Sequence, residues 1–376
     1  MSDRGAKCPL YKKISEDLRN RIISGEYKND DSLPSERELS EMFKVERMTV
    51  RRALELLVKD GLIIKQAGYG SRVVYTYDDE TPNMLTANNI AFILPADNLH
   101  KISEPLMASL FYCIETECRK CGFSLFVIGG ETGNGDIPYL IQQRKIKAAM
   151  WVSQVNESVI RQALLYGIPS IALVNHLREC TSILIDNFDG AVNAIEHLLS
   201  LGHKKIAYIS GIPFYSSSAE RRRGYEQALV NHGIKPSEDL IAEGNWTFES
   251  GHEAMRKLLE GERPTAVFAA NDVMALGAIK AIVDVGLSVP EDLSVVGFDD
   301  VEQAGYAIPP LTTVGADVKL LASYAIKCVS ELIAGDHPNP VKIVLPTKLV
   351  VRESTSAITA VKKQRNAVFT AKAENC

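Results

Sequence analysis

Arginine side chains are concentrated in one short stretch near the start of the chain, residues 47–52, which read RMTVRR. Arg47, Arg51 and Arg52 lie there around Thr49, and Arg37 precedes them. A planar guanidinium donates two parallel hydrogen bonds, which match the major-groove edge of guanine or the oxygens of a phosphate. The chemistry open to this cluster is therefore recognition of a polyanion, with these five residues as candidate contacts.

Three helices and a hairpin are predicted to position these side chains. Apolar residues at helical spacing run from Leu10 to Ile23, Ser35 and Glu38 form a capping box, and a third helix is predicted over about residues 46–59. Two alternating strands then flank a glycine-containing tip at Gly68. This order is typical of a winged helix-turn-helix, in which the third helix enters the major groove of DNA.

The distribution of charge agrees with a polyanion-binding N-terminal unit. The chain has 376 residues and a formal net charge of −5. Residues 1–75 hold 15 lysines and arginines against 12 aspartates and glutamates, a net charge of +3, whereas the remainder carries −8. We find no apolar run of about 18 residues and no apolar core for a signal peptide, so we expect a cytoplasmic protein without a membrane partner.

The motifs of residues 9–73 resemble the DNA-binding domain of the GntR family of bacterial transcription factors. They are LPSERELSE, the V-x-R-x-T-x-R-x-A core at residues 45–53, and L-x-x-x-G-L-I followed by a G-x-G wing. The resemblance implies that operator DNA is contacted by Arg37, Arg47, Thr49, Arg51 and Gly68. The wing departs from the family pattern, since it reads G-Y-G-S-R-V where the family usually has G-x-G-T-F/Y-V.

Two of these arginines also have simpler interpretations. Arg37 can form an ion pair with Glu38 or Glu41 on its own helix, and Arg52 can belong to a solvated helix face. The structure must therefore show whether each guanidinium is paired within the unit.

The remaining residue patterns do not predict catalysis, a metal or a cofactor. Cys113, Cys118 and Cys121 have the spacing C-x4-C-x2-C, but they lie in an amphipathic segment whose buried face suits small apolar side chains, and Cys180 is the only candidate for a fourth ligand. The glycine cluster at 129–135 does not fit G-x-G-x-x-G, and Walker and G-x-S-x-G motifs are missing.

Residues 88–354 are predicted to form an α/β unit that follows an acidic linker at 75–87. Short apolar strands alternate with amphipathic helices, an order typical of parallel sheets with crossover helices. The strands are too many for one sheet, so we expect two open lobes with ligands at the carboxyl ends of their strands. The predicted strands are 90–95, 124–130, 148–153, 170–175, 182–186, 205–211, 266–272 and 293–300.

Three segments of this unit resemble the effector domain of the LacI family, which is similar to periplasmic sugar-binding proteins. They lie at residues 183–211, 221–229 and 264–300 and are followed by PPLTTV at 309–314. The resemblance implies a two-lobed, periplasmic-binding-protein-like (type I) fold with crossing strands, a sugar-sized cleft between the lobes, and a homodimer.

The same resemblance implies which residues bind the effector. Arg221 would bond to sugar hydroxyls, Asn271 and Asp299 would provide polar contacts at strand ends, and Trp246 would stack on the apolar face of the sugar. Further candidates are Asn175 and His176, at the end of an earlier strand, and Asp97, Asn98 and His100, which follow the first strand. Alternatively, Asp299 is a structural cap and His176 a solvated loop residue.

A GntR-type DNA-binding unit on a LacI-type effector domain is the arrangement of the bacterial arabinose repressors, which the whole chain resembles. This implies a repressor released from its operator by a sugar such as L-arabinose. The expected boundaries are 1–74 for the DNA-binding unit, 75–87 for the linker, 88–354 for the effector unit and 355–376 for a flexible tail. A transport-type carbohydrate-binding protein and an α/β sugar-metabolising enzyme are the alternatives.

Overall fold

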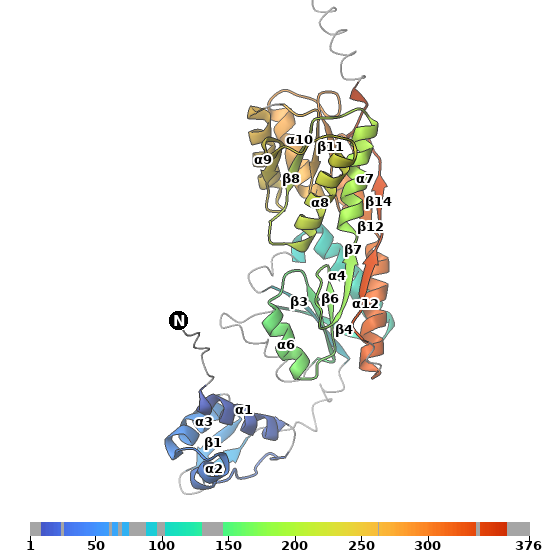
Figure 1. Ribbon diagram of the computed structural model, residues 1–376. Coiled ribbons are helices and arrows are strands. Elements are labelled where there is room, and N and C mark those ends of the chain that lie inside the picture. Colours follow the sequence, from blue (N-terminus) through green and yellow to red (C-terminus); the bar gives the residue numbers. More distant parts are fainter. Residues whose placement is uncertain are drawn as a thin grey trace, which may run out of the picture. The chain divides into compact units, whose positions relative to one another are not determined.

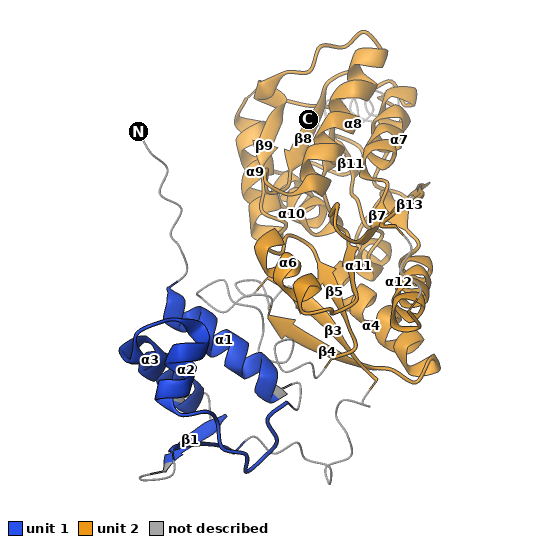
Figure 2. Ribbon diagram, turned by 60° about the horizontal axis from the view of Figure 1, so that its bottom comes forward, with its two compact units in different colours: residues 1–86 blue, residues 87–376 orange. Residues whose placement is uncertain are grey.

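The computed structural model describes residues 9–23, 26–59, 62–66, 70–74, 88–95, 102–129, 146–261, 263–335 and 339–358. The chain divides into two compact units, residues 1–86 and 87–376 (Figure 2). Several predicted features lie outside the described residues. They are the wing tip at Gly68, the whole linker at 75–87, the candidates Asp97, Asn98 and His100, and residues 359–376.

The first unit consists of three helices and a two-stranded antiparallel sheet. Its elements are α1 (Leu10–Ile23), α2 (Glu36–Phe43), α3 (Arg47–Lys59), β1 (Ile63–Gln66) and β2 (Gly70–Val73). The apolar stripes of all three helices meet in one core, where Leu18, Leu39 and Leu57 are fully buried. The core therefore fixes which face of α3 stays exposed.

The start and the end of α2 follow from local sequence. The Ser35 side chain accepts a hydrogen bond from the backbone N–H of Glu38, and the Glu38 carboxylate accepts one from the backbone N–H of Ser35. This reciprocal pair satisfies two donors that a helix start leaves free. Lys44 ends the helix in the left-handed region with φ 53°, and α3 begins three residues later.

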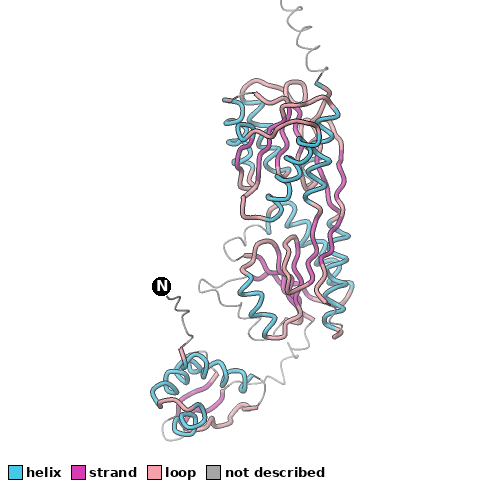
Figure 3. Tube along the Cα trace, viewed as in Figure 1, coloured by secondary structure: helices cyan, strands magenta, loops and turns pink. Residues whose placement is uncertain are grey.

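The second unit contains two parallel sheets, each covered by helices, as Figures 1 and 3 show. The six-stranded sheet has the order β13-β7-β6-β5-β3-β4, and the four-stranded sheet has the order β11-β10-β8-β9. We call the part around the six-stranded sheet lobe A and the part around the four-stranded sheet lobe B. The strands of lobe A are β3 (Asn89–Leu94), β4 (Ser124–Gly129), β5 (Ala148–Val152), β6 (Ser170–Leu173), β7 (Thr181–Ile185) and β13 (Lys342–Leu345).

Lobe B is built around β8 (Ile206–Ser210), β9 (Ile241–Glu243), β10 (Ala266–Ala269) and β11 (Ser294–Val296). Lobe B also contains the antiparallel pair of β12 (Thr313–Ala316) and β14 (Thr347–Val350). The helices of the unit are α4 (Pro105–Lys120), α6 (Glu157–Leu165), α7 (Asn187–Ser200), α8 (Ser216–Asn231), α9 (Phe248–Glu260), α10 (Asp272–Asp284), α11 (Glu302–Tyr306) and α12 (Val318–Ile333), with the short helix η2 (Glu238–Leu240).

The chain passes between the lobes at three described places. It leaves lobe A between β7 and α7, returns between β12 and α12, and leaves again between β13 and β14. At the first place the backbone N–H of Asp186 donates to the carbonyl of Leu345, and the Thr347 hydroxyl donates to the carbonyl of Asp186. Two of the crossings are thus bonded to each other, as expected for a hinge.

The end of the second unit differs from the prediction. The hydroxyl of Thr355 lies 3.0 Å from His197 Nε2, the carbonyl of Ser356 lies 3.0 Å from His203 Nε2, and the N–H of Ile358 donates to the carbonyl of Leu201. Residues up to 358 therefore belong to lobe B, and the predicted boundary at residue 354 falls short.

Candidate functional site

A cavity of about 350 Å³ lies in the second unit and is lined by residues of both lobes. Lobe A contributes Leu94 and Ser153 at strand ends and Pro105 at the start of α4. Lobe B contributes Asn187 and Arg221, among others. The side chains follow strands or begin helices, which is where open parallel sheets bind ligands. The lining residues within the described part of the chain are Leu94, Glu104, Pro105, Leu106, Met107, Ser153, Gln154, Val174, Ile185, Asn187, Tyr215, Ser216, Ser217, Arg221, Trp246, Thr247, Phe248, Glu249, Asn271, Val273, Asp299 and Val301.

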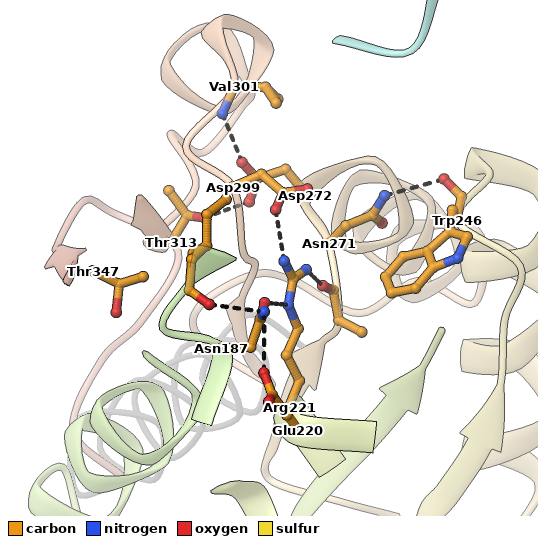
Figure 4. Close-up of polar contacts among 12 residues, drawn as sticks. Asn187, Glu220, Arg221, Trp246, Asn271, Asp272, Asp299, Val301, Thr313 and Thr347 are labelled. Atoms are coloured by element: carbon orange, nitrogen blue, oxygen red, sulfur yellow. Dashed lines mark hydrogen bonds and ion pairs between the residues drawn. The ribbon is translucent and has the colours of Figure 1, made fainter. Parts of the chain in front are cut away.

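Arg221, on α8, is at the centre of a buried network (Figure 4). Its Nε donates to Asn187 Oδ1 at 2.8 Å, its Nη2 to Asp299 Oδ1 at 3.1 Å, and its Nη1 to the carbonyl of Ala270. The guanidinium carbon lies 3.6 Å from the ring centroid of Phe298. These bonds use three of the five N–H donors of an arginine, which leaves two without a partner among the described residues.

Asp299 is the carboxylate partner of Arg221 and sits in a strained backbone segment. Its φ is 110°, a region that residues other than glycine rarely adopt. Its N–H donates to the carbonyl of Val314 on β12 at 2.6 Å, which fixes the segment against a strand next to a crossing. Burial raises the pKa of Asp299 to about 6, and the Arg221 charge opposes this rise.

Asp272 forms hydrogen bonds to the segments next to Asp299 and was not among the predicted site residues. Its side chain is fully buried, accepts a hydrogen bond from Val301 N at 2.9 Å and accepts another from the Thr313 hydroxyl. Burial, followed by the nearby Asp299 charge, raises the pKa of Asp272 well above its usual value. Asp272 thereby connects the start of α10 to the loop after β11 and to the start of β12.

Trp246 lies on the cavity wall, and Asn271 holds it there. The Trp246 backbone has φ 75°, and its ring covers Gly211 so closely that an added Cβ there would lie 2.1 Å from it. Asn271 Nδ2 donates to the Trp246 carbonyl at 3.2 Å, while Asn271 Oδ1 accepts from Met274 N at 2.9 Å and caps α10. Trp246 thus offers an aromatic face, and the Asn271 amide already has two structural partners.

Asn175 and His176, the other predicted cavity residues that the structure describes, do not line the cavity. Asn175 is buried and its Oδ1 accepts from the N–H of His176, whose Nδ1 lies 3.4 Å from the Ser182 hydroxyl. Only the preceding Val174 reaches the cavity wall. The structure therefore brings together Arg221, Trp246, Asn271 and Asp299 and leaves Asn175 and His176 outside.

Several lining residues were missed by the sequence analysis. Asn187 is the most informative, because it begins α7 at the first crossing and bonds to Arg221, to the carbonyl of Ile185 and to Glu220. Its position directly after an apolar strand was the available signal. The other missed polar residues are Glu104, Ser153, Gln154, Tyr215, Ser216, Ser217, Thr247 and Glu249.

The exposed face of α3 holds the candidate nucleic-acid contacts of the first unit. Arg47 and Arg52 are exposed and have no hydrogen-bond or ion-pair partner among the described residues, and Thr49 is half-buried beside them. Arg51 and Arg37 are different, since each is paired with a carboxylate. Arg37 Nε lies 3.1 Å from Glu41 Oε1, which is one of the two pairings considered from the sequence.

Neither unit shows a candidate metal site in its described part. The structure there contains no group of three or more histidine, cysteine, aspartate or glutamate side chains that could hold an ion. It also contains no helix long and apolar enough to cross a membrane.

Comparison with protein-family models matches both units. Residues 10–73 match the model described as bacterial regulatory proteins, gntR family, and residues 195–355 match the periplasmic binding protein-like domain. These spans cover the winged unit and most of lobe B.

Three similar proteins are regulators of transcription by name. The HTH-type transcriptional regulator DegA of Bacillus subtilis is 33% identical over 295 residues, which are 74% of this chain and 86% of DegA. The structure of the transcriptional regulator CelR in complex with cellobiose is 27% identical with a TM-score of 0.66, covering 93% of this chain and all of that one. The lac repressor dimer bound to operator and the anti-inducer ONPF is 28% identical with a TM-score of 0.61, covering 72% of this chain and 95% of that one.

Proposed function

The chain belongs to the LacI-type transcriptional regulators and carries a GntR-family DNA-binding domain, and from this premise we propose that it is a homodimeric repressor released from its operator by a neutral saccharide. The observation that carries the proposal is the cavity lined by both lobes and centred on Arg221 and Trp246. A sugar has a ring of hydroxyls and an apolar C–H face, which a forked donor and an aromatic ring complement.

The charges at the cavity favour a neutral ligand over a phosphate ester or a sugar acid. Arg221 is the only cationic side chain among the described lining residues, and its charge is paired with Asp299. Glu104 and Glu249 add negative charge to the wall. An anionic ligand would therefore find no unpaired cation among these residues to balance its charge. CelR, in its cellobiose complex, gives a precedent for a neutral saccharide, and L-arabinose is a second candidate.

The effector acts, in this proposal, by closing the lobes. A ligand that contacts Ser153 and Gln154 of lobe A and Arg221 of lobe B binds the closed state more tightly than the open one. Closure bends the three crossings and, in a dimer, changes the spacing of the two DNA-binding units. DNA half-sites have a fixed helical spacing, so such a change lowers operator affinity.

Operator recognition is the first part to test. Full-length protein should recover a pseudo-palindromic duplex from a random-sequence pool, because a two-fold dimer binds two related half-sites. Arg47→Ala should weaken binding to that duplex by about 1–3 kcal/mol if Arg47 pairs bidentately with a base. Fluorescence anisotropy with the recovered duplex and a scrambled duplex measures the effect. Equal loss on both duplexes would contradict base recognition by Arg47.

Saccharide release is the second part. A thermal-shift screen can compare neutral pentoses, hexoses and disaccharides with sugar phosphates and uronic acids. One or more of the neutral saccharides should raise the melting temperature of the protein, because a ligand that binds only the native state stabilises it. The positive saccharide should then lower affinity for the recovered duplex about 5–150-fold. Stabilisation by sugar phosphates or uronic acids alone, or tighter DNA binding with saccharide, would contradict the proposal.

A further inference from the structure

The carboxylate of Glu36 joins three elements of the DNA-binding unit. Glu36 is the first residue of α2, and it contacts Arg51 of α3 and Lys65 of β1. Arg51 Nη2 lies 2.9 Å from Glu36 Oε2, Arg51 Nε lies 3.3 Å from Oε1, and Lys65 Nζ lies 3.6 Å from Oε1. The contact with Arg51 is the geometry of a two-bonded arginine–carboxylate pair.

This pairing decides which side of the Arg51 guanidinium remains open. The Nε and Nη2 edge is taken by Glu36, whereas Nη1 has no partner among the described residues. A guanidinium is planar with five N–H donors in fixed directions, so its free donors point away from the carboxylate. Those donors form the second fork of the group, the one that can pair with the O6 and N7 atoms of guanine.

Arg51 is in this respect unlike the neighbouring arginines. Arg47 and Arg52 are exposed and have no carboxylate partner among the described residues. Arg37 has one contact, to Glu41 of its own helix, where both side chains are mostly exposed, at 73% and 68%. A contact from another element fixes a side chain relative to the surface of the unit. Among these four arginines, only Arg51 has such a contact with a described residue.

We propose that Glu36 is a positioning residue for sequence recognition, which holds Arg51 in the orientation that reads a base. The proposal rests on the proposed function, since it assumes that α3 enters the major groove. Glu36 acts through Arg51 and need not contact DNA. Fixing the guanidinium before binding removes rotamer freedom that would otherwise be lost in the complex.

The direction in which Glu36→Gln changes DNA affinity distinguishes a positioning role from a simple charge effect. A carboxylate near DNA repels phosphates, so removal of its charge alone should tighten binding to every duplex. If Glu36 positions Arg51, Glu36→Gln should instead weaken binding to the specific duplex and leave binding to a scrambled duplex unchanged or tighter. Glu55→Gln is the matched control, because Glu55 follows Arg51 by one turn of α3 and no hydrogen bond or ion pair between them is present among the described contacts.

The experiment uses full-length protein and a duplex that the wild type recovers from a random-sequence pool. For each variant, anisotropy gives the ratio of affinities for that duplex and for a scrambled duplex at one salt concentration. Glu36→Gln should lower this ratio roughly tenfold or more, as expected for a lost bidentate contact, and Glu55→Gln should retain it. In an Arg51→Ala background, Glu36→Gln should not change this affinity ratio further, because the effects of two residues that act through one another are not additive.

The outcomes separate this inference from the proposed function. If the wild type recovers no sequence, both fall. If it does recover one, and Glu36→Gln keeps the wild-type ratio or lowers it equally in the Arg51→Ala background, only the positioning role is overturned. Equal melting temperatures of wild type and Glu36→Gln show that a changed ratio does not come from unfolding of the unit.

Discussion

Replacement of Arg221 by alanine should lower the free energy of unfolding by about 3–5 kcal/mol, because it leaves a buried carboxylate without its counter-charge. The side chains of Arg221 and Asp299 are only 4% and 8% exposed, so water screens the charges of this pair little. The same change removes the hydrogen bonds to Asn187 and to the carbonyl of Ala270. Urea unfolding followed by circular dichroism measures the loss.

The neighbouring arginine provides a matched control. Arg222 pairs with Glu226 and Glu238 on the surface, where its own side chain is 39% exposed. Surface pairs of this kind contribute about 0–1 kcal/mol. Arg222→Ala should therefore cost less than about 1 kcal/mol. Similar losses for Arg221→Ala and Arg222→Ala would contradict the buried network.

The cost of Arg221→Ala should also depend on pH, with a definite sign. In the wild type burial raises the pKa of Asp299 to about 6, so its protonation stabilises the fold as the pH falls from about 6 towards the unfolded value near 4. Without the Arg221 charge this pKa rises further, and the carboxylate is protonated already at higher pH. The difference between wild type and variant should be larger at pH 8 than at pH 5.5. A difference that grows as the pH falls would contradict this assignment.

Function should be lost selectively in any Arg221→Ala protein that remains folded. DNA binding depends on the first unit, which is a separate compact unit with its own core. The variant should therefore still bind the recovered duplex but should no longer release it when saccharide is added. A normal response to saccharide would show that the cavity is not the effector site.

The sequence was most informative where local patterns determine structure. The capping box of Ser35 and Glu38 fixed the start of α2 within the predicted winged unit, and both of its hydrogen bonds are present. Apolar runs marked the buried strands β3, β5, β6, β7, β8 and β10, because a strand in a parallel sheet is covered on both faces. Asn271 follows β10, Asp299 follows β11 and Arg221 lies on α8, and all three line the cavity.

The strands near the crossings could not be found in this way. β13 and β14 are separated by a single residue, Pro346, and belong to different sheets, and their side chains are mostly exposed or half-buried. Their partners β7 and β12 are distant in sequence, so no local pattern reveals the pairing. The role of Asn187 depends on the same crossings and was missed for the same reason.

The chemical roles of the cavity residues also needed the structure. The family resemblance implied that the Asn271 amide binds ligand, and the structure adds that its two hydrogen bonds hold Trp246 and the start of α10. Asn175 likewise follows a strand but turns its amide oxygen to the backbone of His176. A polar residue at a strand end has two possible uses, and the sequence does not distinguish them.

Asp272 is the residue for which the structure predicts the second large effect. Asp272→Ala leaves two buried donors, the N–H of Val301 and the hydroxyl of Thr313, without their acceptor. At about 1–3 kcal/mol for each unsatisfied group, the free energy of unfolding should fall by about 2–6 kcal/mol. Asp272→Asn should cost less, because the amide keeps one acceptor oxygen of nearly the same shape.

The same substitution should reach function through the segment that carries Asp299. Gly297 packs against Asp272 so closely that an added Cβ would lie 2.2 Å from Asp272 Oδ1, so the carboxylate and the segment fit without spare room. Without that support, the φ of 110° at Asp299 has less to hold it, and the Arg221 pair loses its orientation. Folded Asp272→Asn protein should therefore bind saccharide more weakly than wild type, measured by calorimetry, while its affinity for the recovered duplex in the absence of saccharide is unchanged. Asp284→Asn, a change on the exposed end of α10, is the control and should alter neither. Wild-type saccharide affinity in Asp272→Asn would mean that the strained segment holds its shape by backbone bonds alone, chiefly the one from Asp299 N to the carbonyl of Val314.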